Sequence, residues 1–149
     1  MTAVDLCGGD GDLATGLARL VSGKLYVFDI DPDVLNQTRG ETEQRDAPVR
    51  GWIWGDIDVL PHVLPEAVDY VLMTNTLHDV SDKRGIAKSV WSALKPGGKF
   101  GVIDWRKIPY DELLTYNKSH GPENRTRLSS DDIRAAIQPA GFAFNTGIE

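Results

Sequence analysis

A glycine-rich turn near the start of the chain is its most distinctive chemical feature. The residues from Val4 to Leu13 are VDLCGGDGDL, so an apolar run with one acid leads into three glycines and then an amphipathic stretch. Glycine lets the backbone take a positive φ and lets a ligand approach with no Cβ in the way. A helix that begins behind such a turn offers unpaired N–H groups. The pattern predicts a strand, a tight turn and a helix start that hold a small ligand against the backbone.

Acidic or amide side chains follow nearly every apolar run. They are Asp5, Asp29 with Asp31, Asp56, Asn75 with His78 and Asp79, and Asp104. In an open parallel sheet, ligands bind beyond the carboxyl ends of the strands, where the strand order reverses. Aspartate is common in loops, but a whole set in register at the strand ends indicates one shared site.

Asp29 has the spacing of a sugar-binding acid. It lies 20 residues beyond Gly9, where a carboxylate accepts hydrogen bonds from a ribose diol. The first turn also carries Asp5, Asp10 and Asp12. This much negative charge favours a cationic or neutral ligand over a pyrophosphate, which needs bare N–H groups and the helix dipole.

Short apolar runs alternate with stretches of helical periodicity. We expect strands at Ala3–Leu6, Leu25–Ile30, Val49–Trp54, Val68–Thr74 and Phe100–Asp104. We expect helices from about Leu13 to Val21, from Asp33 to about Arg45, from Ser81-Asp82 to Leu94, and from Ser129 or Ser130 to about Pro139. Three further segments are a loop or single turn at Val59–Pro65, a turn at Lys95–Gly98, and a final strand that opens at Gly141-Phe142.

This alternation indicates a parallel sheet covered on both sides, because most of the strands are apolar on both faces. The fold class is therefore expected to be α/β, with a doubly wound, mostly parallel sheet in three layers, α/β/α. A length of 149 residues fits one domain over 1–149. Trp52, Trp54 and Trp91 are expected to pack within these elements rather than to contact a ligand.

The composition limits which kinds of partner and which cellular compartment fit this protein. The net charge of −6 argues against a nucleic-acid partner, which requires a basic face. There is no apolar run of membrane-spanning length, and Met1-Thr2-Ala3 leads straight into the first strand without a secretion signal. The single Cys7 excludes an internal disulfide and a cysteine metal cluster, and no other ligand spacing indicates a metal. We expect a cytoplasmic protein without a membrane span.

With these motifs in place, the chain resembles the class I S-adenosylmethionine-dependent methyltransferases, particularly their small-molecule branch. Asp5–Gly11 is similar to that family's acidic-x-Gly-x-Gly-x-Gly loop, with Cys7 at the first glycine position. Phe28–Pro32 resembles the second motif, in which Asp29 would hold the ribose hydroxyls. Gly55–Ile57 resembles the third, in which Asp56 would take the adenine amino group. The resemblance continues through Asn75–Asp79, Leu94–Lys99 and the last helix with its Ala-Gly-Phe ending.

The resemblance implies a Rossmann-like core that binds S-adenosylmethionine and releases S-adenosylhomocysteine. The implied cofactor-binding residues are Asp5, Cys7, Gly8, Gly9, Gly11, Asp29, Ile30, Asp56, Ile57 and Asn75. The implied reaction is methyl transfer to a small-molecule acceptor by in-line displacement at the sulfonium methyl, in which the protein mainly supplies alignment. If the acceptor must lose a proton, the candidate bases are His78, Asp104 and His120.

Two other functions fit part of the pattern. Gly9–Ala14 matches G-x-G-x-x-A and Asp29 matches its ribose acid, as in an NAD(P)-binding Rossmann domain of an oxidoreductase. The charge of Asp5 before the turn and the motif at Asp56-Ile57 favour the methyltransferase. A non-catalytic cofactor-binding scaffold is the third interpretation. Members of the family usually have a helix before the first strand and further strands at the end, so association into a homo-oligomer would cover the exposed edge and apolar surface.

Overall fold

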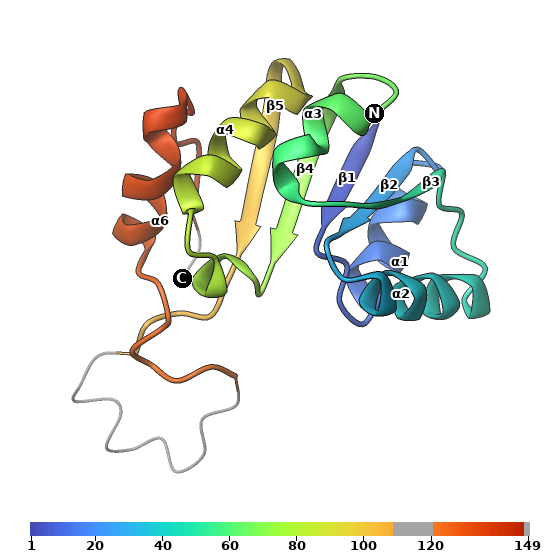
Figure 1. Cartoon of the computed structure of the whole chain (residues 1–149), viewed down its shortest axis with the longest axis horizontal. Helices are drawn as coiled ribbons and strands as arrows, with labels where there is room; N and C mark the ends of the chain where they lie inside the picture. Colours follow the sequence, from blue (N-terminus) through green and yellow to red (C-terminus); the bar gives the residue numbers. More distant parts are fainter. Residues whose placement is uncertain (109–120, 148–149) are drawn as a thin grey trace.

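The computed structural model describes residues 1–108 and 121–147, and in this part of the chain a parallel sheet forms the centre of the molecule (Figure 1). Its strands are β1 (Ala3–Leu6), β2 (Leu25–Asp29), β3 (Gly51–Trp54), β4 (Val68–Thr74) and β5 (Leu94–Ile103). They are parallel and lie in the order β3-β2-β1-β4-β5. The predicted α/β class and doubly wound sheet are confirmed.

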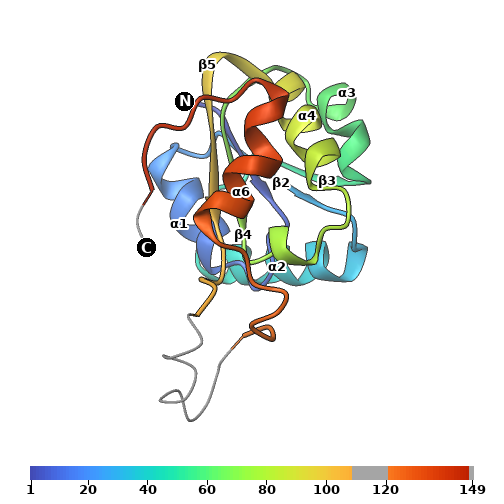
Figure 2. The ribbon, with the colours of Figure 1, turned by 90° about the vertical axis from the view of Figure 1, so that its left-hand side faces the viewer.

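Helices cover both faces of this sheet, which gives the three expected layers (Figure 2). One face carries α1 (Asp12–Leu20) and α2 (Pro32–Gln44), and the other carries α3 (Leu60–Val63), α4 (Lys83–Ala93) and α6 (Ser130–Ile137). The described residues also form the short 3₁₀ turns η1 (Ile57–Val59), η2 (Leu77–Asp79) and η3 (Gln138–Ala140). Val4, Leu6 and Phe28 point into the core under α4, while Ala3 and Val27 point into the core under α1.

The helix starts follow the capping residues expected from the sequence. Asp31 caps α2, because its Oδ1 accepts hydrogen bonds from the backbone N–H groups of Asp33 (2.8 Å) and Val34 (3.4 Å). Pro32 occupies the first helical position, where its missing N–H costs nothing. Ser129 caps α6 and forms a reciprocal capping box with Asp132.

The junction between α4 and β5 differs from the expected turn at Lys95–Gly98. Helix α4 ends at Ala93 and β5 begins at Leu94. Leu94 pairs with Val68 and Lys99 pairs with Tyr70, so the intervening residues bulge from the ladder and remain part of the strand. The Nζ of Lys95 lies 3.1 Å from Asp69 Oδ1, and this ion pair lies beside the bulge.

Two further expectations were wrong. The described residues 141–147 form no strand; instead the Phe142 ring packs edge-on against Trp91, with centroids 4.9 Å apart, and lies 5.7 Å from Phe100. Trp52 packs beside the α1/α2 core as expected, but Trp54 is 68% exposed at the end of the edge strand β3.

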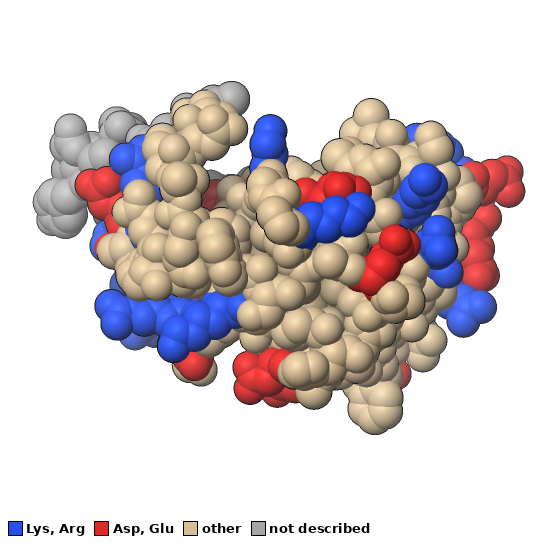
Figure 3. All heavy atoms as spheres, turned by 90° about the horizontal axis from the view of Figure 1, so that it is seen from above, with Lys and Arg blue, Asp and Glu red and all other residues tan. Residues whose placement is uncertain are grey.

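The amino edge of the sheet carries charges of both signs. Asp69 accepts a hydrogen bond from the Thr2 backbone N–H at 2.7 Å, and this bond together with Lys95 lowers the pKa of its carboxyl. Figure 3 shows this side from above, with Lys and Arg side chains in separate groups among Asp and Glu. Over the described ranges, no helix is long and apolar enough to cross a membrane, and no group of three or more His, Cys, Asp or Glu residues is placed to hold a metal ion.

Candidate functional site

The carboxyl ends of β1 and β4 lie next to each other where the strand order reverses. β1 pairs with β2 on one side and with β4 on the other, so the chain builds outward in both directions from β1. Doubly wound sheets bind ligands at this point. The loop after β1 and the segment after β4 are therefore the backbone parts that define the site.

The glycine loop (Cys7–Gly11) makes a tight turn between β1 and α1. A Cβ on Gly8 would lie 2.9 Å from both Thr38 Cγ2 and Val27 Cγ1, so only glycine fits against α2 and β2 here. Gly9 has a φ of +53°, and a Cβ there would meet no atom within 4 Å. One side of the loop is thus packed against protein, and the backbone at Gly9 is open to a ligand.

Thr38 holds this loop from outside, and sequence reasoning missed it. Its side chain is fully buried in α2, and its Oγ1 donates to the Gly9 carbonyl at 2.7 Å or to the Val34 carbonyl at 2.9 Å. A hydroxyl has one proton and serves one of these acceptors at a time. The contact ties the middle of the glycine loop to a helix that is otherwise largely exposed.

Asp5 is the most unusual group in the site. Its side chain is fully buried, and within residues 1–108 and 121–147 neither carboxylate oxygen has a hydrogen-bond partner. Burial, and then the negative charge of Asp29, raises the pKa of Asp5 from 3.8 to about 7. A buried acceptor without a partner is costly in a folded protein. Asp5 therefore has the capacity to accept hydrogen bonds from a cationic ligand.

Asp29 ends β2 on the same face of the sheet as Asp5, because the residues next to each acid in its strand point into the core on the opposite face. It is 6% exposed, and its Oδ1 accepts a hydrogen bond from the Asp31 backbone N–H at 2.9 Å. Burial raises its pKa, while the hydrogen bond from Asp31 opposes the rise. The charge of Asp29 thus acts on Asp5, and both acids belong to the set that the sequence analysis expects to share one site.

Cys7 connects this acidic pair to the segment after β4. It has a φ of +70°, in the left-handed region that favours glycine, and its N–H donates to the Phe28 carbonyl at 2.8 Å. Burial, and then the charge of Asp29, raises the pKa of the Cys7 thiol to about 12, although a hydrogen bond with the Thr76 side chain opposes the rise. The thiol therefore stays protonated at neutral pH.

The remaining predicted cofactor residues lie along the same edge. Ile30 follows Asp29 and is 60% exposed. Asp56 follows β3, is exposed, and caps η1 by accepting the Asp58 N–H at 3.4 Å, while Ile57 packs partly against the core. Asn75 follows β4 with a φ of +51°, and its N–H donates to Ile103 at 2.8 Å. These residues follow β2, β3 and β4, and β1 lies between β2 and β4 in the sheet.

His78 and Asp104, both predicted as candidate bases, form a buried pair. His78 Nδ1 lies 2.6 Å from Asp104 Oδ1, and the His78 backbone N–H donates to Asp104 Oδ2 at 2.9 Å. The Trp105 N–H adds a third bond to this carboxylate at 2.7 Å. The side chains are 4% and 1% exposed, and His78 Nε2 lies 3.2 Å from Asp79 Oδ2. The pair fixes η2 against the end of β5. His120, the third candidate, lies outside the described residues.

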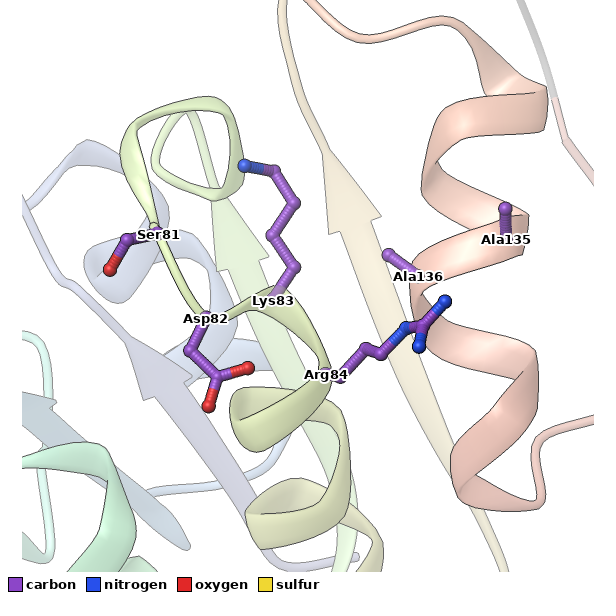
Figure 4. Close-up of a pocket in the computed structure, with 6 residues that line it drawn as sticks. All are labelled: Ser81, Asp82, Lys83, Arg84, Ala135 and Ala136. Carbon is purple, nitrogen blue, oxygen red and sulfur yellow. The ribbon is translucent and has the colours of Figure 1, made fainter.

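A separate pocket of about 330 Å³ lies between the start of α4 and α6 (Figure 4). It contains none of the predicted site residues. Its lining consists of Ser81, Asp82, Lys83, Arg84, Ala135 and Ala136. Lys83 Nζ donates to the Val80 carbonyl at 2.6 Å, so this lysine already has a partner in its own turn. The buried acids Asp5 and Asp29 lie in β1 and β2 and the open backbone lies in the glycine loop, so none of these features belongs to this pocket.

Comparison with known proteins agrees with this geometry. Residues 1–119 match the sequence model of the ubiE/COQ5 methyltransferase family. A 2-phytyl-1,4-naphtoquinone methyltransferase of Nostoc punctiforme is 32% identical over 119 residues, which cover 78% of this chain and 52% of that protein. The ubiquinone/menaquinone biosynthesis C-methyltransferase UbiE of Escherichia coli is 32% identical, with 95% of this chain and 66% of that protein covered. The chain thus spans between about half and two thirds of these relatives.

Solved structures show the same fold. A SAM-dependent methyltransferase of Aquifex aeolicus superposes with a TM-score of 0.77 at 20% identity, covering 95% of this chain and 71% of that one. The glycopeptide N-methyltransferase MtfA, solved with S-adenosyl-L-methionine, superposes with a TM-score of 0.58 at 22% identity, covering 68% of this chain and 43% of that one. The family match favours the methyltransferase interpretation over the dinucleotide-binding one. This chain belongs to the ubiE/COQ5 methyltransferase family and has the fold of the class I S-adenosylmethionine-dependent methyltransferases.

Proposed function

We propose that this chain binds S-adenosylmethionine and transfers its methyl group to a small-molecule acceptor, with S-adenosylhomocysteine as the product. The observation that carries the proposal is the Asp5 carboxylate, which is fully buried beneath the glycine loop without a protein partner within the described part of the chain. A ligand with ammonium and sulfonium charges suits such a group, whereas a pyrophosphate does not. Family membership supports the same cofactor.

The residues present fit this cofactor in chemistry and in order along the edge. The open backbone at Gly9 leaves room for a ligand against the loop. Asp29 would accept from the sugar hydroxyls, and the Asp31 N–H, which donates to its Oδ1 at 2.9 Å, would orient the carboxylate for this. Asp56 and Ile57 would meet the base, and Asp5 would meet the positively charged end.

The cofactor, when bound, supplies a methyl group on sulfonium with a neutral leaving group. The protein's share of the work is therefore binding and alignment, which contributes up to about 7–11 kcal/mol of the barrier in well-oriented systems. Asp104 holds the His78 ring by accepting at Nδ1, and this leaves Nε2 as the ring atom that would take a proton from an acceptor. Asp79, which faces Nε2 at 3.2 Å, is 73% exposed and free to turn toward solvent.

For the acceptor we propose a ring carbon of a quinone-type molecule in its reduced form. Support comes from the relatives named as a naphthoquinone methyltransferase and as a ubiquinone/menaquinone C-methyltransferase. Methylation at carbon requires loss of a proton from the acceptor, which gives the His78–Asp104 pair a chemical role.

Thermal-shift measurements test the cofactor half of this proposal. The protein is heated with S-adenosylmethionine, S-adenosylhomocysteine, NAD or NADP, each at a saturating concentration. Stabilisation by the first two alone is expected, and amounts to about 2.7 kcal/mol when the ligand is at a hundredfold excess over Kd. Stabilisation by NAD or NADP alone would select the oxidoreductase alternative. No shift with any ligand would overturn the proposal.

A further inference from the structure

Trp54 is an exposed aromatic residue with one specific polar contact. Its side chain is 68% exposed, yet its indole Nε1–H donates to the Ile30 carbonyl at 3.0 Å. An indole N–H is a donor only, so its partner must be an acceptor such as this carbonyl oxygen. Ile30 is itself 60% exposed, and burial of its side chain therefore does little to hold this part of the chain.

The contact lies directly beside the candidate sugar-binding acid. Trp54 is the register partner of Asp29 in the parallel pairing of β2 and β3. The Gly55 N–H donates to the Asp29 carbonyl at 3.1 Å, and the indole holds the next carbonyl, that of Ile30. The Asp31 N–H in turn donates to Asp29 Oδ1 at 2.9 Å. Three successive hydrogen bonds thus fix the turn from Asp29 to Asp31. Two of them have backbone donors, and the third has the Trp54 indole as its donor.

We propose that Trp54 is a positioning residue for Asp29: its indole N–H holds the Ile30 carbonyl, and thereby keeps the turn in the conformation that presents the Asp29 carboxylate. The role of Asp29 toward a sugar rests on the function proposed above. The role of Trp54 toward the turn does not, because it concerns hydrogen bonds within the free protein. The two are therefore tested separately.

The Trp54→Phe variant removes the donor and keeps an aromatic ring. The matched control is Trp91→Phe. Trp91 lies in α4, is also half-exposed, at 48%, and contacts Phe142 rather than the turn after β2. In the ligand-free protein, NMR exchange with water is measured at the Asp31 amide. We expect faster exchange in Trp54→Phe, unchanged exchange in the control, and an unchanged unfolding midpoint in Trp54→Phe.

Calorimetry with S-adenosylhomocysteine measures the effect on binding. Loss of one hydrogen bond that orients the acid is expected to weaken binding about fivefold in Trp54→Phe and not in Trp91→Phe. The same substitution in an Asp29→Asn background should have no further effect, because Trp54 affects binding only by positioning the Asp29 carboxylate.

The outcomes separate the two proposals. Unchanged exchange at the Asp31 amide overturns the positioning role, whatever the ligand does. An equal loss of binding in the presence and absence of the Asp29 carboxylate also overturns it, since Trp54 would then act by another route. A wild-type protein that does not bind S-adenosylhomocysteine overturns the proposed function, while the exchange measurement still decides the role of Trp54.

Discussion

Replacing Asp5 with asparagine should stabilise the ligand-free protein at high pH and weaken its binding of the cofactor. The carboxylate is fully buried without a partner in the described structure, and its pKa is raised from 3.8 to about 7. Because the folded-state pKa lies above the unfolded one, stability from this group is fully present below pH 3.8 and is lost as the pH rises to about 7. Asparagine does not ionise, so Asp5→Asn does not lose stability as the pH rises.

The magnitude follows from the size of the shift. At about 1.4 kcal/mol for each factor of ten in the ionisation constant, the ionised Asp5 lowers the free energy of unfolding by about 4 kcal/mol above pH 7. The asparagine amide would also lack partners, which costs about 1–3 kcal/mol. The net gain in Asp5→Asn is thus about 1–3 kcal/mol at pH 8, and it is smaller by about 3 kcal/mol at pH 5.

Urea denaturation of both proteins at pH 5 and pH 8 measures these differences. Asp10→Asn is the matched control, because Asp10 is exposed in the same loop. Calorimetry at pH 8 should show weaker S-adenosylhomocysteine binding in Asp5→Asn, and wild-type binding should strengthen as the pH rises through about 7, where Asp5 becomes ionised. A variant that is less stable than wild type at pH 8, or a stability change that is the same at both pH values, would refute the reasoning.

Three other substitutions test the remaining contacts. Asp29→Ala should weaken S-adenosylhomocysteine binding by about 1.5–3 kcal/mol through loss of a charged acceptor, and unchanged affinity in calorimetry would remove Asp29 from the site. Thr38→Val should lower the free energy of unfolding by about 1–3 kcal/mol because it strands the Gly9 carbonyl, whereas Thr42→Val, which loses only a bond within its own helix, should cost less in the same urea titration. Asp104→Ala should lower the free energy of unfolding by about 3–5 kcal/mol, because it leaves His78 without its buried partner. Asp79→Ala, at an exposed position, should lower it by at most about 1 kcal/mol. Equal losses in the two variants would contradict a buried pair.

Much of the fold could be predicted because its signals are local. The buried strands are apolar on both faces, Asp31-Pro32 is a helix start of known chemistry, and the glycine spacing requires a turn after the first strand. The positions of Asp5 and Asp29 could be anticipated for the same reason, since each lies at or next to the carboxyl end of a strand of the parallel sheet.

The other features depend on contacts that no local pattern encodes. Thr38 lies in the middle of a polar helix, and only the packing of α2 shows that its hydroxyl reaches the glycine loop. The contact between His78 and Asp104 joins residues that are 26 positions apart and depends on the register of β4 and β5. The exposure of Trp54 follows from the position of β3 at the sheet edge, which alternation along the strand does not reveal.

The protonated, partly buried thiol of Cys7 makes the motion of the glycine loop measurable. Cys7 is the single cysteine of the chain, and its pKa of about 12 leaves almost no thiolate to react with alkylating reagents at neutral pH. Modification by iodoacetamide is therefore expected to be slow while the loop is closed, and faster when the loop opens and the thiol loses the surroundings that raise its pKa. The rate of that modification, followed by mass spectrometry, therefore reports on opening of the loop at its native cysteine, and no cysteine has to be introduced.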